Sequence, residues 1–257
     1  MPTVQEIEQA LFDWAPRELA ASWDNVGLLA GSGAGNAGRI LIALDITEWV
    51  ADEALACGAD LVVSHHPLMN CRWHEVQNIR DDNAQGRTII KLLRGGISGI
   101  CMHTNLDAAE GGVNDILARR LGLQAPAAFN EEKIGRIGTL KYEKGLEEFL
   151  KDVIQLLDCK GLRYRDAGKP VHRVAVGGGS CAEYISQAIA LGCDTFVTSD
   201  IKYHDFLDAN GINLIDAGHF ETENPICEAI KAYLDGRFPG LETVISTSHR
   251  GVIQYYT

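Results

Sequence analysis

Two adjacent histidines end an apolar run in the stretch Asp60-Leu61-Val62-Val63-Ser64-His65-His66-Pro67. The β-branched run predicts a buried strand, and Pro67 ends it. Neighbouring strand residues point to opposite faces, but at a strand end the chain can turn so that both imidazoles reach one small volume. Imidazole is the commonest protein ligand for transition metals, so the pair predicts part of a metal site. A buried, hydrogen-bonded histidine at an ordinary turn is the alternative.

Two further strand ends carry possible ligands. His103 and Asp107 follow one apolar run, and His219 and Glu223 follow another. The last two are four residues apart, so one helical turn places both side chains on one face. Each group alone has a plainer explanation, such as Asp107 capping the next helix. Their shared position at strand ends favours a metal site over these separate explanations.

Together these groups offer up to four imidazoles and two carboxylates. A single catalytic zinc typically takes about three protein ligands, so the set fits two metals bridged by a carboxylate and a water. We expect His103 to orient other groups or to act as a general acid or base, ahead of binding metal directly. The ligand types suit Zn, Fe, Mn, Ni or Co and do not choose among them.

The elements that must position these groups follow a strand–helix–strand pattern. The sequence predicts strands over 40–44, 61–64 and 97–102, with a helix ending at Gly58 between the first two. So short a crossover indicates parallel strands with right-handed connections. Ligands bind beyond the carboxyl ends of parallel strands, which is where the histidines fall.

A second copy of this pattern follows in the chain. Residues 39–66 align without a gap with residues 173–200, and six aligned pairs are identical. We interpret this as an internal duplication, and chance similarity of two such units is the alternative. The copies differ at one strand end, where Ser199-Asp200 replaces His65-His66, so we expect one shared cluster.

The expected fold is therefore α/β, with two similar α/β lobes at about 1–125 and 126–257. We expect mainly parallel sheets flanked by helices, with the metal site at the carboxyl ends of strands between the lobes. We also expect a terminal strand over 251–255.

A glycine run and several aromatic residues leave alternatives open. Gly177-Gly178-Gly179 follows a strand, and its N–H groups could hold an anion, although a tight turn is an equal alternative. Trp23, Trp73 and Tyr255-Tyr256 could stack a base, but we expect them to pack in a core. Four more histidines are expected on the surface or in loops: His74, His172, His204 and His249.

The composition excludes several classes. The 257 residues include 23 Lys and Arg against 35 Asp and Glu, a net charge of −12, which argues against non-specific nucleic-acid binding. The seven cysteines are scattered without a Cys-x-x-Cys motif, which favours a reducing cytoplasm over a disulfide framework. No signal peptide and no apolar run of about 18 residues is found, so no membrane association is expected.

Five motifs in this order make the chain resemble the GTP cyclohydrolase 1 type 2 homologues, also called the Nif-three-like family. The resemblance covers nearly the whole chain. The motifs are Ser22-Trp23-Asp24-Asn25-Val26-Gly27-Leu28, Leu44-Asp45-Ile46-Thr47, Ser64-His65-His66-Pro67-Leu68, His103-Thr104-Asn105-Leu106-Asp107 and Gly218-His219-Phe220-Glu221-Thr222-Glu223.

The resemblance implies two divalent metal ions per subunit, with Glu223 bridging and His103 lining the same pocket. It also implies a ring-shaped homohexamer whose metal clusters face the inner cavity, and opening of the GTP purine ring by metal-activated water. The metal ligands it implies are His65, His66, Asp107, His219 and Glu223.

We therefore expect a dinuclear metal hydrolase that acts on a small-molecule substrate, with GTP or another nucleotide as the first choice. His103 and Glu223 are the expected catalytic residues. A phosphoesterase with the same metal centre is one alternative. A non-catalytic, metal-binding assembly protein is the other.

Overall fold

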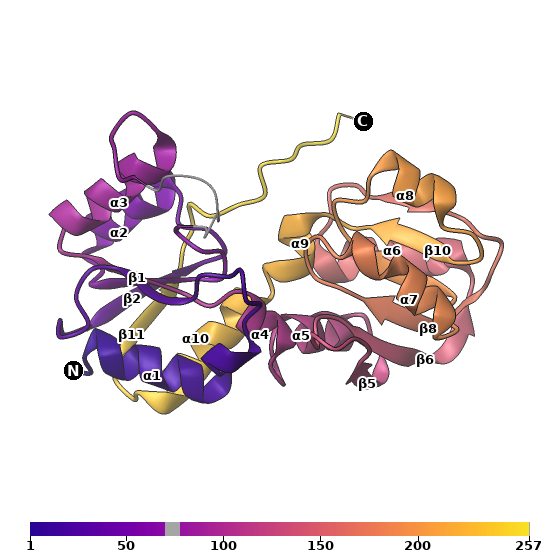
Figure 1. The fold of residues 1–257 in the computed structure, drawn as a ribbon, viewed down its shortest axis with the longest axis horizontal. Helices are drawn as coiled ribbons and strands as arrows, with labels where there is room; N and C mark the ends of the chain where they lie inside the picture. Colours follow the sequence, from indigo (N-terminus) through magenta and orange to yellow (C-terminus); the bar gives the residue numbers. More distant parts are fainter. Residues whose placement is uncertain (70–77, 257) are drawn as a thin grey trace. The chain divides into compact units, whose positions relative to one another are not determined.

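The computed structural model describes residues 1–69 and 78–256 (Figure 1). The chain forms two compact units, Met1–Ala109 with Ile226–Arg250, and Glu110–Pro225 with Gly251–Thr257. The lobes expected at 1–125 and 126–257 differ from these units. The chain after Ala109 already belongs to the second unit, and the last helix and strand return to the first, because that strand pairs with an early one.

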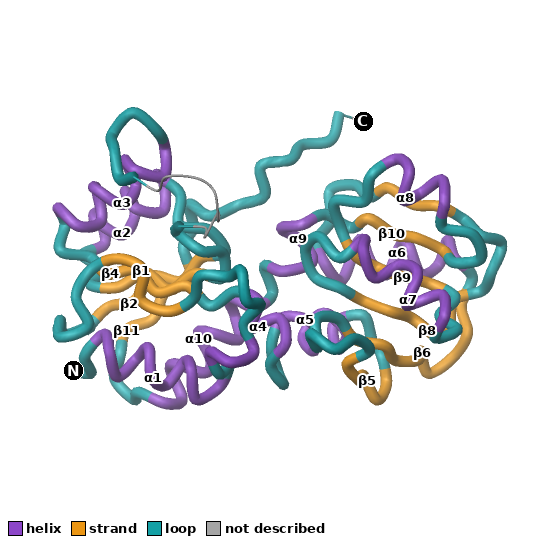
Figure 2. Tube along the Cα trace, in the orientation of Figure 1, coloured by secondary structure: helices purple, strands orange, loops and turns teal. Residues whose placement is uncertain are grey.

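The first unit contains a five-stranded sheet in the order β1-β4-β3-β2-β11 (Figure 2). All its strands run parallel except β1. Figure 1 shows α2 and α3 on one face of the sheet and α1 and α10 on the other. The elements are α1 (Val4–Trp14), η1 (Arg17–Leu19), β1 (Gly27–Ala30), β2 (Arg39–Ala43), α2 (Glu48–Cys57), β3 (Leu61–Ser64), α3 (Ala84–Arg94), β4 (Ser98–Cys101), α4 (Thr104–Ala108), α10 (Ile226–Arg237) and β11 (Glu242–Ile245).

The second unit contains a six-stranded sheet in the order β5-β6-β8-β9-β10-β7. Its central strands β8, β9 and β10 are parallel, and the outer strands are antiparallel to their neighbours. The elements are α5 (Val113–Arg120), β5 (Gln124–Ala128), β6 (Arg136–Lys144), α6 (Leu146–Leu157), β7 (Arg163–Arg165), β8 (Val171–Val176), η2 (Ala182–Tyr184), α7 (Ile185–Ala190), β9 (Thr195–Thr198), α8 (Tyr203–Asp208), β10 (Asn213–Asp216) and α9 (His219–Glu223).

The predicted repeat is visible in the strand register. Ile40 pairs with Leu61 in the first sheet, and the residues aligned with them, Val174 and Thr195, pair in the second. The third strands β4 and β10 complete a parallel trio in each sheet. The two copies therefore share their hydrogen-bond register, which chance similarity of sequence does not require, and this supports the duplication.

The turn before β3 and the turn before β9 are also built alike. The Asp60 carboxylate accepts hydrogen bonds from the backbone N–H groups at 38 and 39, at 2.7 and 3.0 Å. Asp194 accepts from those at 172 and 173, at 3.0 and 2.6 Å. Gly58 and Gly192 stand two residues before these carboxylates with φ of 68° and 76°, a left-handed conformation that glycine adopts without strain. Each glycine ends its helix and lets the chain turn into the next strand.

Most of the predicted elements are confirmed, and one predicted strand is wrong. The short helix α4 and the strand β5 were not expected. The strand expected over 251–255 is wrong, because these residues pair with no strand in the described part of the chain. Val252 and Ile253 are 73% and 61% exposed, and no strand edge among the described residues pairs with them. Their intrinsic preference for strands is not enough to form a strand without such a partner.

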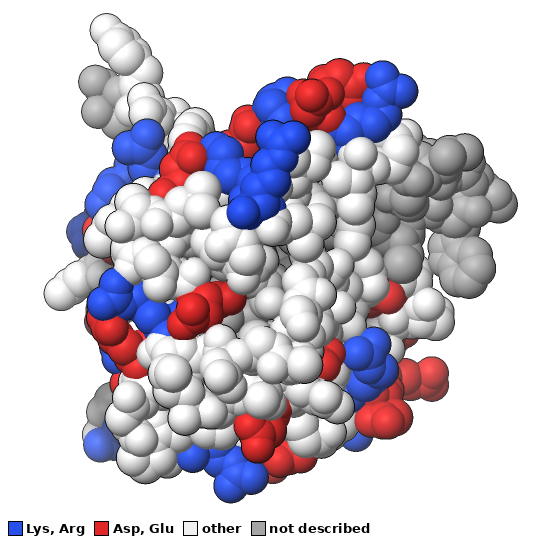
Figure 3. All heavy atoms as spheres, turned by 90° about the vertical axis from the view of Figure 1, so that its left-hand side faces the viewer, with Lys and Arg blue, Asp and Glu red and all other residues white. Residues whose placement is uncertain are grey.

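Two general features concern the helix lengths and the charged surface. The longest described helices, α6 and α10, have 12 residues each, and none in the described residues is long and apolar enough to cross a membrane. Figure 3 shows the first-unit face, on which Lys and Arg side chains are interspersed with Asp and Glu. The described part of this face therefore lacks the continuous basic stripe of a nucleic-acid-binding protein.

Candidate metal centre

The histidine pair at the end of β3 lies as the sequence predicts. The backbone ladder continues past Ser64, because the N–H of His66 donates to the Leu44 carbonyl at 2.9 Å. The Ser64 hydroxyl donates to the His66 carbonyl at 2.8 Å and closes a turn. The turn brings the two imidazoles to a centroid distance of 5.0 Å, with His65 fully buried.

Each ring of this pair is fixed through its Nδ1 atom. His65 Nδ1 lies 2.8 Å from the carbonyl oxygen of Met102, and His66 Nδ1 lies 2.7 Å from Asp45 Oδ1. A carbonyl or carboxylate oxygen only accepts, so Nδ1 carries the proton in both rings. In the neutral imidazole Nε2 then holds the lone pair that binds a metal.

His103 stands between β4 and α4 and completes a group of three imidazoles. Its ring centroid lies 5.2 Å from that of His65 and 5.7 Å from that of His66. The three rings offer ligand atoms that lie within 4.8 Å of one another. Three imidazoles this close, each available as a nitrogen donor, could hold a metal ion in the first unit.

Asp24 holds His103 in place. Its Oδ1 accepts from His103 Nδ1 at 2.9 Å, and its Oδ2 accepts from the backbone N–H of Thr104 at 2.9 Å and from the Thr104 hydroxyl. Burial raises the pKa of Asp24, but the hydrogen bonds from His103 and Thr104 outweigh it and lower the pKa to about 2. Asp24 is therefore ionised at neutral pH and keeps the proton of His103 on Nδ1.

Asp107 reaches the cluster through the unpredicted helix α4. Its backbone N–H donates to the His103 carbonyl at 3.0 Å, so the two residues lie one helical turn apart. Its Oδ1 lies 3.6 Å from His65 Nε2. The alternative role considered for Asp107, capping the following helix, is wrong, because Gly112 is the N-cap of α5.

The second unit contains another histidine–carboxylate pair. His219 and Glu223 are the first and last residues of α9, and His219 Nε2 lies 3.1 Å from Glu223 Oε2. His219 Nδ1 lies 2.7 Å from Asp200 Oδ2, so Nδ1 again carries the proton. Asp200 lies two residues after the end of β9, at the position that the alignment matches with His66.

The glycine run packs against this second pair. The N–H of Gly178 donates to Asn114 Oδ1 at 2.9 Å and that of Gly179 to Thr222 Oγ1 at 3.0 Å, so protein groups take the donors that an anion would need. The anion-binding interpretation is therefore wrong. A Cβ on Gly179, where φ is +64°, would lie 2.1 Å from Glu223 Oε1 and 3.1 Å from His219 Nε2. Glycine is needed here because the loop lies directly against the side chains of Glu223 and His219.

The donor set fits a transition metal in both units. Four imidazoles present Nε2 as the lone-pair nitrogen, since each Nδ1 donates to a carbonyl or a carboxylate. Metal-binding histidines almost always have this second bond, which fixes the tautomer and the ring orientation. The sequence analysis missed the three carboxylates that provide it, although two of them stand in the quoted motifs: Asp24, Asp45 and Asp200.

The remaining predictions on histidines and aromatic residues have mixed outcomes. His74 and Trp73 lie outside the described residues. His172 and His204 are exposed as expected, whereas His249 is half-buried, and burial lowers its pKa. Trp23 is 52% exposed, so the expectation that it packs in a core is wrong. Of the tyrosine pair, Tyr256 is exposed and Tyr255 packs against Gly161.

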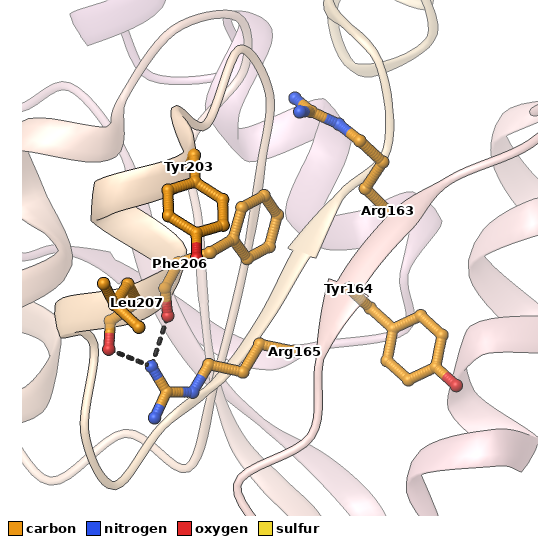
Figure 4. A pocket seen from close by; sticks show the side chains of 6 residues that line it. All are labelled: Arg163, Tyr164, Arg165, Tyr203, Phe206 and Leu207. Carbon is orange, nitrogen blue, oxygen red and sulfur yellow. Dashed lines mark hydrogen bonds between the residues drawn. The ribbon is translucent and has the colours of Figure 1, made fainter.

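A pocket of about 510 Å³ lies elsewhere in the second unit, between β7 and α8 (Figure 4). The Arg165 guanidinium donates to the carbonyls of Phe206 and Leu207, at the end of α8. Arg163 donates to the Asp216 carboxylate and to the carbonyl of Ile201. Both arginines thus bind the protein itself, and they attach α8 to the edge strand.

Comparison with known proteins identifies the family. A family model described as Duf34/NIF3 (NGG1p interacting factor 3) matches residues 2–251. The chain belongs to this family. This Duf34/NIF3 protein is 35% identical over 245 residues to the GTP cyclohydrolase 1 type 2 homolog of Clostridium perfringens, covering 90% of this chain and 92% of the relative. It is 32% identical over 264 residues to that of Clostridium acetobutylicum, covering 98% and 97%.

Solved structures agree with the family and the fold. A Bacillus cereus protein related to NIF3 superposes with a TM-score of 0.90 at 25% identity, covering 100% of this chain and 99% of the other. A hypothetical protein of Staphylococcus aureus gives 0.89 at 29% identity and covers both chains completely, at 100% each. The predicted resemblance and the α/β fold are confirmed.

Proposed function

We propose that this Duf34/NIF3 protein is a hydrolase whose side chains would hold two divalent metal ions, with Glu223 among the residues that would hold them. The observation that carries the proposal is the common orientation of the imidazoles, each fixed through Nδ1 with Nε2 as the donor. The proposed ligands are His65, His66, Asp107, His219 and Glu223.

The spacing within each unit supports a metal between histidine and carboxylate. Two ligands that each lie about 2.0–2.2 Å from one metal are separated by about 3–3.6 Å. The separation is 3.6 Å between His65 Nε2 and Asp107 Oδ1, and 3.1 Å between His219 Nε2 and Glu223 Oε2. Each unit thus contributes one such pair, and two pairs with additional imidazoles suit two ions better than one.

His103 is the proposed proton carrier. Bound metals would supply Lewis acidity that lowers the pKa of a water molecule toward neutrality. The ionised Asp24 carboxylate holds the proton of His103 on Nδ1, so Nε2 is the ring nitrogen that can accept a proton and return it. The names of the relatives support the purine ring of GTP as the first substrate. One water would open the five-membered ring at the carbon between its two nitrogens and leave a formyl group on one of them, and a second water would release that group as formate.

The test combines metal analysis with a product screen. Protein purified without chelator should contain about two ions per chain by elemental analysis. Reconstituted with Zn, Mn, Fe or Mg, it should release formate from GTP. Release of phosphate from generic phosphoesters, without formate from GTP, would mean that the protein is a phosphoesterase and not a cyclohydrolase. Bound metal with neither product would leave a non-catalytic metal-binding protein, and metal well below about one ion per chain would overturn the centre itself.

A pair of substitutions on one helix controls for damage to the fold. Glu223→Gln should lose metal and turnover together. Glu221→Gln changes the same group two residues away, on a side chain that is only half-buried, and should retain both. Equal metal content in the two variants would exclude Glu223 as a ligand.

We also propose that the protein acts in the cytoplasm as a ring-shaped homohexamer. Six cysteines lie in the described residues and form no disulfide with one another, which suits a reducing compartment. Light scattering should give a mass about six times the 28.0 kDa of the chain. A monomeric mass would exclude the ring.

A further inference from the structure

The indole of Trp23 lies half-exposed beside the histidine group of the first unit. Its ring centroid is 6.0 Å from that of His103, with an angle of 73° between the planes. The His103 ring lies 5.2 Å from that of His65. One imidazole therefore separates the exposed indole from a proposed metal ligand.

The backbone on both sides of Trp23 is fixed before any ligand arrives. Trp23 lies in a turn closed by the Asp24 N–H, which donates to the Ala21 carbonyl at 2.9 Å. The Ala21 N–H donates to Thr104 Oγ1 at 2.9 Å, and Asp24 accepts from the Thr104 N–H at 2.9 Å. The turn is thus attached to the start of α4 at both ends. A ring held in this way loses little conformational freedom when something stacks on it.

A second tryptophan of the same unit gives a matched comparison. Trp49 on α2 is 54% exposed, against 52% for Trp23. The Arg250 guanidinium lies over its ring at 5.7 Å from the centroid, so Trp49 has a cation–π partner within the protein. Trp23 instead contacts the edge of a proposed proton carrier. Because the two indoles are similarly exposed, Trp49 can serve as a control. An effect seen on substitution of Trp23 but not of Trp49 is due to the position of Trp23 beside His103, and not to the loss of an exposed indole.

We propose that Trp23 is the stacking platform for a planar, π-rich ring of the substrate, a heteroaromatic base, which it holds beside His103. The assignment rests on the proposed function for the identity of the site, but the stacking itself needs no metal. Aromatic side chains stack any base, since every base presents a π face. A fused ring on the indole would lie with one edge toward His103, where the proton is transferred. A simple alkyl or sugar phosphate would gain nothing from this surface.

Equilibrium binding to the full chain tests the platform. Titration calorimetry with guanosine should show that Trp23→Ala binds at least about 10-fold more weakly than wild type, because the stacking surface is lost. Trp23→Phe keeps a π face and should stay within about 3-fold of wild type. Trp49→Ala should bind guanosine as wild type does. Ribose 5-phosphate, which has no base, should bind all four proteins alike.

Three results would overturn the assignment. Wild-type protein that does not bind guanosine would exclude a base at this site. Equal guanosine affinity in Trp23→Ala and Trp49→Ala would remove Trp23 from binding. A changed assembly mass in Trp23→Ala with unchanged guanosine affinity would assign the indole to a contact between protein chains instead.

The failure of the platform differs from failure of the proposed function. Asp107→Asn should lose metal yet keep guanosine binding that depends on Trp23. If that binding persists while metal-loaded wild type releases neither formate nor phosphate, the hydrolase proposal falls and the platform stands. If Trp23→Ala and Trp49→Ala turn over GTP with the same KM, the hydrolase proposal stands and the stacking role of Trp23 falls.

Discussion

The ends of β3 and β9 occupy aligned positions in two copies of one unit, yet they present different chemistry. In the first copy, Asp45 holds the imidazole of His66. In the second, the position of Asp45 is taken by Gly179 and that of His66 by Asp200. Asp200 then holds the imidazole of His219. The carboxylate that orients a histidine therefore follows the first strand of the unit in one copy and the second strand in the other.

This difference explains how two copies of one fold present different side chains at their strand ends. The first copy gathers three imidazoles from the ends of two strands. The second supplies one imidazole and one glutamate from a single helical turn, and Gly179 makes room for them. Register and turns are retained in both copies, while the residues at the strand ends differ in chemistry. Substitutions at matched positions can test which parts are shared.

The crowding at Gly179 should give the largest effect. Gly179→Ala places a methyl group 2.1 Å from Glu223 Oε1, so the carboxylate must move although no ligand is removed. We expect elemental analysis to find about one ion per chain or fewer. Gly168→Ala is the control, with a similar φ of +70° and nothing within 4 Å of the new Cβ. Equal metal loss in both would attribute the effect to backbone strain and remove the special role of the glycine.

The two histidine-orienting carboxylates should have similar effects despite their non-aligned positions. Asp45→Ala and Asp200→Ala each remove the Nδ1 acceptor of one ligand, and such losses weaken metal binding by about 10- to 100-fold. Competition with a chelator measures the affinity. The asparagine variants retain an acceptor oxygen and should recover most of it. If Asp200→Ala binds metal as wild type does, the comparison between the copies fails at this point.

The repeated turn should be equally important in both copies. Asp60→Ala and Asp194→Ala each leave two backbone N–H groups without their carboxylate acceptor. The free energy of unfolding of the affected unit should fall by about 1–3 kcal/mol in each variant. Urea denaturation measures it, and the double variant should be additive because the sites share no partner. A loss confined to one variant would show that only one turn is still needed for stability.

Glu53→Gln should give the smallest effect, and it makes the first copy resemble the second, which has Gln187 at the aligned position. Burial raises the pKa of Glu53, but hydrogen bonds from Ser246, Thr247 and Ser248 lower it to about 2. The ordinary value is 4.5, so this stabilisation is complete above pH 4.5 and is lost as the pH falls toward about 2.

At neutral pH the Glu53→Gln variant should melt about 2–4 °C below wild type, the shift that a loss of about 1 kcal/mol causes in a unit of this size. The difference in Tm should shrink as the pH falls below 4.5. A difference that stays constant down to pH 3 would mean that the packing of Glu53, and not its charge, stabilises the segment after β11.

Much of the fold could be predicted from the sequence because its signals are local. Helix α2 ends at Gly58 as predicted, and β3 spans the predicted residues. The parallel pairing expected of a strand–helix–strand unit is present between β2 and β3 and between β8 and β9. Helix α4 was missed because its five residues are too few for a hydrophobic period.

The site could be predicted only as far as its residue types. Histidines at strand ends identified the nitrogen donors, since strand ends are visible in the pattern. Their carboxylate partners depend on pairings across 79 residues for Asp24, 21 for Asp45 and 19 for Asp200, and no spacing rule connects them. The role of Gly179 depends on a contact with Glu223 that only the coordinates reveal.

The interleaving of the two units has a consequence for synthesis on the ribosome. Strand β11 (Glu242–Ile245) completes the first sheet beside β2 (Arg39–Ala43), whereas the elements of the second sheet all lie within residues 110–225. The edge of β2 therefore stays open while residues 110–225, which contain the whole second sheet, emerge at about 5–20 residues per second. We expect the second sheet to form before the first sheet is complete, although the first sheet begins earlier in the sequence. During that interval the unfinished N-terminal sheet is the part that a chaperone would need to shield.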